Sequence, residues 1–363
     1  QCSEEGAGSS PVLASSDEQA IKLWDVESGQ RLKTFRGYPQ VNWTVSFTPD
    51  ATVLVSGGQE QVVRVWDVHT ETCVQSLGTH DSYVHTLSHH PTDSVVASGA
   101  GNTLSIWNLE TSCLINVLEG HEGHIWHVAF SPKGKYLASA CYDHTAKIWD
   151  WKAGNCLQTL RGHETWLYGI CFSPDGRLLA TSGMDKLIKL WDYKTGKCTK
   201  SIRTDTDWMT DIDFSPDGKI IVGAGSQGGV TLWSVETGEL LGNLLEHAGF
   251  VSCVRFSPNG KEFVSSSHDQ TIKIWDATTL KCLRTLKGHE NMVSSVSLST
   301  DNRMLASASH DETVRLWDIS SGECLKVLKA PRPYENMNIK GVTGLTEAQK
   351  STLSVLGAVQ RSD

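Results

Sequence analysis

The sequence has no excess of basic residues and no long apolar run. Lys and Arg total 32 against 41 Asp and Glu, which gives a formal net charge of −9, and no basic run occurs. Because phosphate-binding surfaces carry a basic excess or stripe, this balance argues against nucleic acid as a partner. The apolar runs have the length of β-strands, so we expect no membrane-spanning helix and no membrane partner. No secretion signal is recognisable, but the chain starts at Gln1, so upstream segments stay an open alternative.

The sequence also lacks the cysteine pattern of a disulfide framework. Most of its cysteines recur once per repeating unit, six or seven residues after a Trp. Equivalent strands of neighbouring units lie too far apart for a disulfide, which needs Cα atoms within about 7 Å. We therefore expect free thiols and a reducing, cytoplasmic location.

Tryptophan supplies the organising pattern of the chain. Successive spacings of 42, 41, 42, 42, 42, 42 and 42 residues separate Trp24, Trp66, Trp107, Trp149, Trp191, Trp233, Trp275 and Trp317. A fixed period of this length indicates one supersecondary unit copied along the chain.

Each unit has the pattern of four short strands. In the last one, residues 293–298, 304–309, 313–318 and 324–328 alternate apolar and polar side chains or form short β-prone runs between turn residues. A four-stranded sheet cannot bury both of its faces alone, and radial packing of such sheets solves this problem. The pattern predicts an all-β propeller.

At this point the residues resemble the WD40 repeat family, over about residues 12–330. Trp-Asp follows the period at Trp24, Trp66, Trp149, Trp191, Trp275 and Trp317, with Trp107-Asn108 and Trp233-Ser234 as departures. Gly-His occurs at His121, His163 and His289. The tail at 333–350 is similar to the C-terminus of large bacterial, notably cyanobacterial, WD-repeat proteins, whose N-terminal parts often carry signalling domains.

The resemblance implies a buried, hydrogen-bonded set of four residues in each complete blade. The implied structural tetrads are His121, Ser139, Asp143 and Trp149; His163, Thr181, Asp185 and Trp191; His247, Ser265, Asp269 and Trp275; His289, Ser307, Asp311 and Trp317. A His beside a Ser and an Asp also invites a nucleophilic-triad interpretation. Fourfold repetition at fixed spacing favours the structural role, which is to satisfy buried polar groups. Elsewhere the set is incomplete, with Tyr38 or Asp205 in place of His, Gly223 in place of Ser, and Gly101 or Gln227 in place of Asp.

The number of blades has two interpretations. The repeats fall at about 12–36, 37–78, 79–119, 120–161, 162–203, 204–245, 246–287 and 288–330, after an N-terminal remnant at 1–11. The first repeat lacks its innermost strand. We favour eight blades with an incomplete first blade, which residues 338–342 would complete, because no linker separates the first two repeats. The alternative is a closed ring of seven blades with the first repeat left over.

The tail, 331–363, is expected to contain a short helix at about 347–356. Thr346 and Gln349 form a capping-box pattern, and Gly357 is a C-terminal stop. We expect this helix to pack on the propeller.

The family also implies where a partner binds. Three positions per repeat lie on the top face around the central channel. In this sequence, aromatic residues are distributed unevenly over these positions. The candidate partner-binding residues are Trp43, Tyr83, His124, Trp126, Tyr142, Trp166, Tyr168, Met184, Trp208 and Phe250. Contiguous exposed aromatics are typical of interaction sites.

The sequence therefore predicts a non-catalytic scaffold or sensor module that binds proteins or peptides, as part of a larger signalling protein that includes upstream domains. The alternatives are a small molecule bound in the channel, or an enzyme that uses the top face as a platform. No cofactor is expected. The spacing of His121, His124 and His127 could suggest a metal, but His121 has its tetrad role and strand alternation separates the others, so no metal is expected either.

Overall fold

The computed structural model describes residues 41–70, 72–329 and 350, together with the backbone of three strands between residues 12 and 36. The chain divides into two compact units. One is Gln40–Lys329, and the other combines Gln1–Pro39 with Ala330–Asp363. All elements of the described residues are strands.

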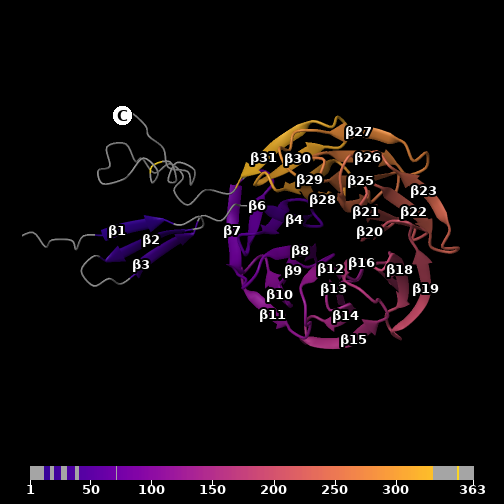
Figure 1. The fold of residues 1–363 in the computed structure, drawn as a ribbon, viewed down its shortest axis with the longest axis horizontal. Coiled ribbons are helices and arrows are strands. Elements are labelled where there is room, and N and C mark those ends of the chain that lie inside the picture. The colour runs from indigo at the N-terminus through magenta and orange to yellow at the C-terminus, as the bar shows by residue number, and fades with distance from the viewer. Residues whose placement is uncertain are drawn as a thin grey trace, which may run out of the picture. The chain divides into compact units, whose positions relative to one another are not determined.

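Residues Gln40–Lys329 form seven four-stranded antiparallel sheets arranged in a ring (Figure 1). Blade 1 contains β4 (Asn42–Phe47), β5 (Val53–Gly58), β6 (Val62–Asp67) and β7 (Thr72–Thr79). Blade 2 contains β8 (Val84–His89), β9 (Val95–Ala100), β10 (Thr103–Asn108) and β11 (Leu114–Leu118). Blade 3 contains β12 (Ile125–Phe130), β13 (Leu137–Cys141), β14 (Thr145–Asp150) and β15 (Asn155–Arg161).

The remaining four blades repeat this order. Blade 4 contains β16 (Leu167–Phe172), β17 (Leu178–Gly183), β18 (Leu187–Asp192) and β19 (Lys197–Arg203). Blade 5 contains β20 (Met209–Phe214), β21 (Ile220–Gly225), β22 (Val230–Ser234) and β23 (Leu240–Leu244). Blade 6 contains β24 (Val251–Phe256), β25 (Glu262–Ser267), β26 (Ile272–Asp276) and β27 (Cys282–Leu286). Blade 7 contains β28 (Val293–Leu298), β29 (Met304–Ser309), β30 (Thr313–Asp318) and β31 (Cys324–Lys329).

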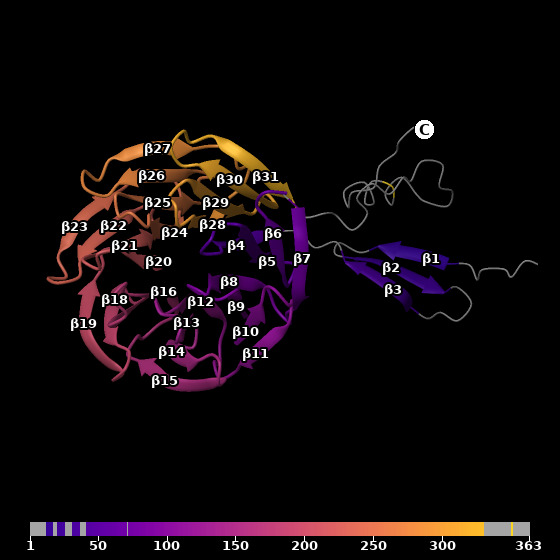
Figure 2. The same cartoon turned by 180° about the vertical axis from the view of Figure 1, so that it is seen from behind.

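Every blade runs from the centre outwards, so the first strand lies at the axis and the fourth at the circumference (Figures 1 and 2). The second strands show why the blades need each other. In β9 all six residues are buried, because neighbouring blades cover both faces of the strand. Small residues such as Ala97, Ser98 and Gly99 let those neighbours approach closely.

The hydrophobic core lies between adjacent blades. Leu104 and Ile106 of blade 2 share one cluster with Val128 and Trp149 of blade 3, and all four are nearly or fully buried. Burial of such a side chain contributes roughly 1.5–3 kcal/mol. Each blade is therefore stabilised chiefly by its two neighbours.

The turns between first and second strands follow the local sequence. In Ser173–Gly176, the Ser173 hydroxyl donates to Asp175 at 2.7 Å, and the Gly176 amide donates to the Ser173 carbonyl at 2.8 Å. Gly176 has a φ of 63°, a left-handed conformation that glycine adopts without steric cost.

The prediction of an all-β propeller with four-stranded antiparallel blades is confirmed, but the prediction of eight blades is wrong. The ring closes with seven, because β28 of the last blade packs directly against β4 of the first. The first repeat forms a separate three-stranded sheet of β1 (Val12–Ser16), β2 (Ala20–Asp25) and β3 (Arg31–Arg36). Continuity of two repeats along the chain does not require that they share a ring.

Two predictions fall largely outside the described residues. The segment 338–342, which was expected to complete the first repeat, lies outside them. So does the helix expected at 347–356, apart from Lys350.

Candidate functional site

The innermost strand of every blade contains a β-bulge at the same position. In β12, Ile125 pairs with Cys141 and His127 pairs with Ala140, so Trp126 has no partner on β13. The bulged residues of the seven blades are Trp43, His85, Trp126, Tyr168, Thr210, Ser252 and Ser294. A bulge re-aims the side chain of its extra residue. All of these residues except Tyr168 line the central cavity.

The bulged residues divide the ring into two parts. In blades 5 to 7 they are hydroxyl residues that join their blade to the next one. Thr210 donates to the Val251 carbonyl at 2.7 Å and Ser252 to the Val293 carbonyl at 2.5 Å. Ser294 donates to the Asn42 carbonyl at 2.8 Å, which links the last blade to the first. In blades 1 to 4 the bulged residues are aromatic.

The aromatic residues of blades 1 to 4 contact one another in a continuous series. Trp43 lies 4.4 Å from His85, His85 lies 4.9 Å from Trp126, and Trp126 stacks on Tyr142 at 5.4 Å, all measured between ring centroids. Tyr142 in turn stacks on Trp166 at 4.7 Å. We call the connected set the aromatic arc; it consists of Trp43, Tyr83, His85, His124, Trp126, Tyr142, Trp166, Tyr168 and His310.

The arc lies on one face of the ring, which we call the top face. In an antiparallel blade, the turn between the second and third strands and the loop that leads to the next blade lie at the same end. Tyr142, Met184 and His310 come from the turns, and Tyr83, His124 and Trp166 from the loops. The other turns lie on the opposite face.

The structure brings most of the predicted partner-binding residues together. Trp43, Tyr83, His124, Trp126, Tyr142, Trp166 and Tyr168 belong to the arc, and the hydroxyl of Tyr168 donates to the sulfur of Met184 at 3.7 Å. Trp208 and Phe250 form a separate pair 6.0 Å apart, which His268 extends at 4.7 Å from Phe250.

Exposure differs along this face. Trp166 is 45% exposed and Trp208 40%, and His124 is exposed as well. Tyr168 is buried, and Trp43, Tyr83, Trp126, Tyr142, Met184 and Phe250 are half-buried. The accessible part of the predicted site therefore consists mainly of the rings of Trp166, Trp208 and His124.

Sequence reasoning did not select three histidines that belong to this surface: His85, His268 and His310. Their signal is positional, because they occupy the same repeat positions as the chosen aromatics. Burial lowers the pKa of His85 to about 4 and also lowers that of His268 and His310, so these rings are neutral at pH 7.

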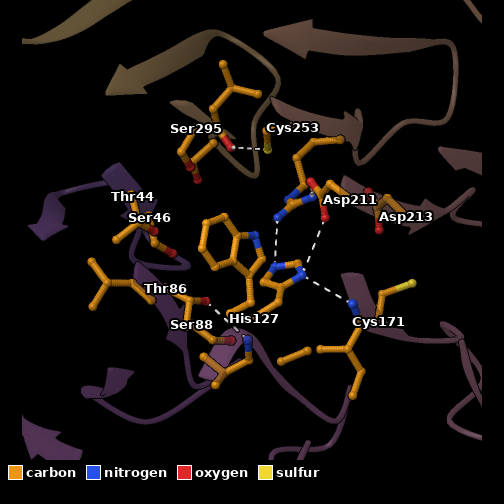
Figure 3. Close-up of a pocket in the computed structure, with 18 of the residues that line it drawn as sticks. Thr44, Ser46, Thr86, Ser88, His127, Cys171, Asp211, Asp213, Cys253 and Ser295 are labelled. Atoms are coloured by element: carbon orange, nitrogen blue, oxygen red, sulfur yellow. Dashed lines mark hydrogen bonds and ion pairs between the residues drawn. The ribbon is translucent and has the colours of Figure 1, made fainter. Parts of the chain in front are cut away.

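A polar cluster in the channel was also missed. Below the bulges lies a cavity of about 310 Å³ (Figure 3). Arg255 of blade 6 reaches across it, with its guanidinium 3.1 Å from Nε2 of His127 in blade 3, and forms an ion pair with Asp211 of blade 5. Nδ1 of His127 lies 3.4 Å from Asp211. The sequence signal was the ionisable side chains of His127, Asp211 and Arg255 on innermost strands.

Burial dominates the electrostatics of this cluster. It lowers the pKa of His127 to about 4 and raises that of Asp213 to about 6. The two thiols beside them, Cys171 and Cys253, are protonated, because burial raises the pKa of Cys253 to about 12 and that of Cys171 well above its usual value. The cluster thus holds one guanidinium between two carboxylates.

The residues of the implied tetrads are hydrogen-bonded to one another. In blade 3, His121 lies 2.7 Å from Asp143 through Nδ1 and 2.7 Å from Ser139 through Nε2, and Trp149 donates to Ser139 at 2.8 Å. The tautomer with its proton on Nδ1 satisfies all partners. The same bonds occur among His163, Thr181, Asp185 and Trp191; His247, Ser265, Asp269 and Trp275; His289, Ser307, Asp311 and Trp317.

These sets have the connectivity of a catalytic triad but not its accessibility. Ser139 is fully buried and its oxygen already accepts the indole N–H, so no substrate carbonyl can reach it. Burial opposes ionisation of Asp143, but hydrogen bonds from His121 and Thr145 outweigh it and hold its pKa below its usual value. In each of these four blades the set holds together the loop, the second strand and the third strand.

The incomplete sets have local substitutes. In blade 2, His80 lies 3.1 Å from Ser98, which accepts the Trp107 indole at 2.9 Å, and Gly101 stands where Asp would be. In blade 5, a Cβ on Gly223 would lie 2.1 Å from the Met209 methyl, so that methionine fills the space of the missing hydroxyl residue. Gln227 donates to Asp207 at 2.8 Å. Tyr38 lies outside the described residues.

Three further observations concern other features of the described residues. In the described part of the chain, ligand atoms of His121, Cys141 and Asp143 lie within 4.8 Å of one another, but both ring nitrogens of His121 are already hydrogen-bonded. The cysteines of the described residues are free thiols. The described part of the chain contains no helix that is long and apolar enough to cross a membrane.

A ring of repeated four-stranded blades with a His–Ser–Asp–Trp set in most of them defines a WD-type β-propeller. The model of the WD domain, G-beta repeat, matches this chain seven times, at residues 29–67, 71–108, 112–150, 154–192, 196–234, 238–276 and 280–318. The chain belongs to the WD40 repeat family.

Curated relatives share this repeat. The chain is 35% identical over 133 residues to the WD repeat-containing protein SL1-17 of Schistosoma mansoni, covering 36% of this chain and 44% of that protein. It is 26% identical over 137 residues to the transcriptional corepressor LEUNIG_HOMOLOG of Arabidopsis thaliana, covering 37% and 17%. It is 30% identical over 149 residues to the nuclear distribution protein PAC1 of Arthroderma benhamiae, covering 38% and 32%.

The matches span less than half of these relatives' lengths. All three are eukaryotic proteins, so the predicted relationship to bacterial multidomain proteins is not supported.

Proposed function

We propose that this propeller is a non-catalytic module that binds a partner protein or peptide on its top face. The binding residues are those of the predicted set: Trp43, Tyr83, His124, Trp126, Tyr142, Trp166, Tyr168, Met184, Trp208 and Phe250. The observation that carries the proposal is the aromatic arc, in which rings from four successive blades contact one another and end in exposed Trp166. Anchored aromatics that present a large area with little loss of side-chain freedom are typical of interface hot spots.

The names of the relatives agree with such a role. One is called a transcriptional corepressor and another a subunit of the THO complex, and such names describe proteins that act within assemblies. A signalling role and a cytoplasmic location stay predictions from the sequence.

The chemistry of the channel supports a non-catalytic role. A general base needs an accessible lone pair, but both ring nitrogens of His127 already face hydrogen-bonding partners. A nucleophilic cysteine needs a thiolate, and burial keeps the Cys171 and Cys253 thiols protonated.

A second candidate function is the binding of a small molecule in the channel. The cavity of about 310 Å³ is at the lower end of the volumes of ligand pockets, roughly 300–1,000 Å³. The indole N–H of Trp43 lies at its wall, buried and without an acceptor in the described part of the chain.

A retention experiment with two exposed tryptophans tests the proposal. The variant Trp166→Ala/Trp208→Ala removes the two exposed tryptophans of the top face. We expect it to lose the proteins that the immobilised wild-type propeller retains from a cell extract, with little change in its thermal unfolding temperature.

The matched control is Leu157→Ala/Leu283→Ala, which removes side chains that are 49% and 44% exposed on the outermost strands β15 and β27. This control should retain the same proteins as the wild type. Equal retention by the tryptophan variant, or equal loss by the control, would contradict the proposed site.

A further inference from the structure

The loops that surround the aromatic arc carry a strong excess of negative charge. Four of the loops that enter a blade have an exposed carboxylate two residues before the residue that faces the top: Asp81 before Tyr83, Glu122 before His124, Glu164 before Trp166, and Glu290 before Met292. We call these four residues the acidic rim. None of them forms an ion pair with another described residue.

Positive charge on the same face is limited, and Arg161, Arg203 and Lys329 lie at its circumference, where they end the fourth strands β15, β19 and β31. In the described loops and turns of the top face, the basic residues are Lys186 and Lys287. Lys186 is paired with Asp207 at 2.7 Å. The histidines His85, His268 and His310 do not offset the rim, because burial keeps them neutral at pH 7.

The aromatic arc and the acidic rim are complementary to the same kind of group. The face of an aromatic ring attracts a cation through its quadrupole, and Trp and Tyr do so most strongly. Exposed carboxylates raise the local concentration of cations and repel anionic partners. A segment with alternating basic and small residues can place its cations against both.

One donor without an acceptor belongs to a residue of the aromatic arc. The Trp43 indole N–H is buried at the cavity wall and has no acceptor among the described residues. A buried donor without a partner costs roughly 1–3 kcal/mol. Because this nitrogen has no accessible surface, a peptide carbonyl would recover that cost only after rotation of the Trp43 side chain. Below this position the Arg255 guanidinium crosses the channel to His127 and forms an ion pair with Asp211.

We propose that the partner of the top face is an extended peptide segment rich in Lys and Arg, held between the acidic rim and the aromatic arc. This inference rests on the proposed function and specifies the chemistry of its partner. The rim supplies long-range attraction and the arc supplies short-range contact with the cationic side chains.

Fluorescence anisotropy with defined peptides tests this inference. The probe is a fluorescein-labelled dodecapeptide in which Lys and Arg alternate with Gly and Ser, and its acidic counterpart carries Glu and Asp instead. We expect the wild-type propeller to bind the basic probe, more weakly as salt is raised because the attraction is screened. The acidic probe should not bind.

Two charge variants of equal net charge locate the effect. The rim variant is Asp81→Asn/Glu122→Gln/Glu164→Gln/Glu290→Gln. The control variant is Glu110→Gln/Glu236→Gln/Glu239→Gln/Glu323→Gln, which removes exposed carboxylates from turns on the opposite face. We expect the rim variant to weaken binding of the basic probe by about tenfold or more and the control to change it less than about twofold.

The outcomes separate this inference from the proposed function. Equal binding of the basic probe by the rim variant and the wild type, or failure of the wild type to bind it, overturns the inference. If the tryptophan variant still loses retained proteins in that case, the top face is an interaction site for a partner of different chemistry. If neither the tryptophan variant nor the rim variant changes any binding, both are wrong.

Discussion

The tetrad of blade 4 allows hydrogen bonding to be separated from packing at a single position. Thr181 is fully buried, and its hydroxyl lies 2.8 Å from Nε2 of His163 and 2.8 Å from Nε1 of Trp191. Thr181→Val keeps the volume of the side chain and removes the hydroxyl, which leaves both nitrogens buried without a partner. Each such group costs about 1–3 kcal/mol, so we expect a loss of about 2–6 kcal/mol in the free energy of unfolding.

The companion variant Thr181→Ser keeps the hydrogen bonds and reduces the packing instead. It keeps the hydroxyl and removes one buried methyl group, which costs about 1 kcal/mol. We therefore expect the valine variant to be the less stable of the two, although serine is the larger change in volume. If packing matters more than hydrogen bonding at this position, Thr181→Ser will be the less stable variant.

Hydrogen exchange followed by mass spectrometry is the suitable assay, because a ring of seven blades does not necessarily unfold in one step. Protection of the β17 and β18 amides should fall more in Thr181→Val than in Thr181→Ser, and a denaturant series gives the accompanying change in global stability. Equal protection in the two variants, or greater loss in Thr181→Ser, would refute the role of the hydroxyl.

Two further predictions concern stability. Burial lowers the folded-state pKa of His80, His85 and His127 from about 6.5 to about 4, so the unfolded chain binds more protons than the folded chain between these pH values. Their contribution to stability is complete above pH 6.5 and should fall by about 1–2 kcal/mol per histidine at pH 5. Asp213 opposes this trend, because burial raises its pKa to about 6. An unfolding temperature that is the same at pH 7.5 and pH 5 would contradict this. In blade 5, Gly223→Ala places a Cβ 2.1 Å from the Met209 methyl and 2.9 Å from the Trp233 ring, so we expect a loss of about 1–3 kcal/mol in the free energy of unfolding. Absence of any shift in the unfolding temperature of Gly223→Ala would show that the site repacks freely.

The blades could be predicted from the sequence because their determinants are local and repeated. Strand alternation, turn residues and the Trp period each lie within one unit, and eight copies reinforce them. The residues of the four implied tetrads could be chosen for the same reason, since the spacing from His121 to Trp149 recurs unchanged in three other blades.

The closure of the ring could not be predicted in the same way. It depends on whether β28 meets β4, which are separated by most of the chain, and nothing in either strand specifies the number of blades between them. The absence of a linker after Arg36 was a poor guide, because a repeat can follow another in sequence without joining its ring.

The channel cluster was beyond sequence reasoning for a related reason. His127 and Arg255 are 128 residues apart and meet across the axis of the ring, so no spacing links them. The difference between aromatic and hydroxyl residues at the bulged position could be seen in the sequence, since Trp126 and Ser252 occupy the same position of their repeats. Only the structure shows that Ser252 donates a hydrogen bond to the next blade, whereas Trp126 stacks on its neighbours.

Site-specific photo-crosslinking within one blade tests the central claim most directly. The photoreactive residue p-benzoylphenylalanine is introduced in place of His124, which is exposed on the top face, or in place of Leu157, which is exposed on the outermost strand of the same blade. We predict that the retained partner forms a covalent adduct with the chain altered at His124 and none with the chain altered at Leu157. An adduct at Leu157 with none at His124 would place the partner on the circumference and contradict a top-face binding module.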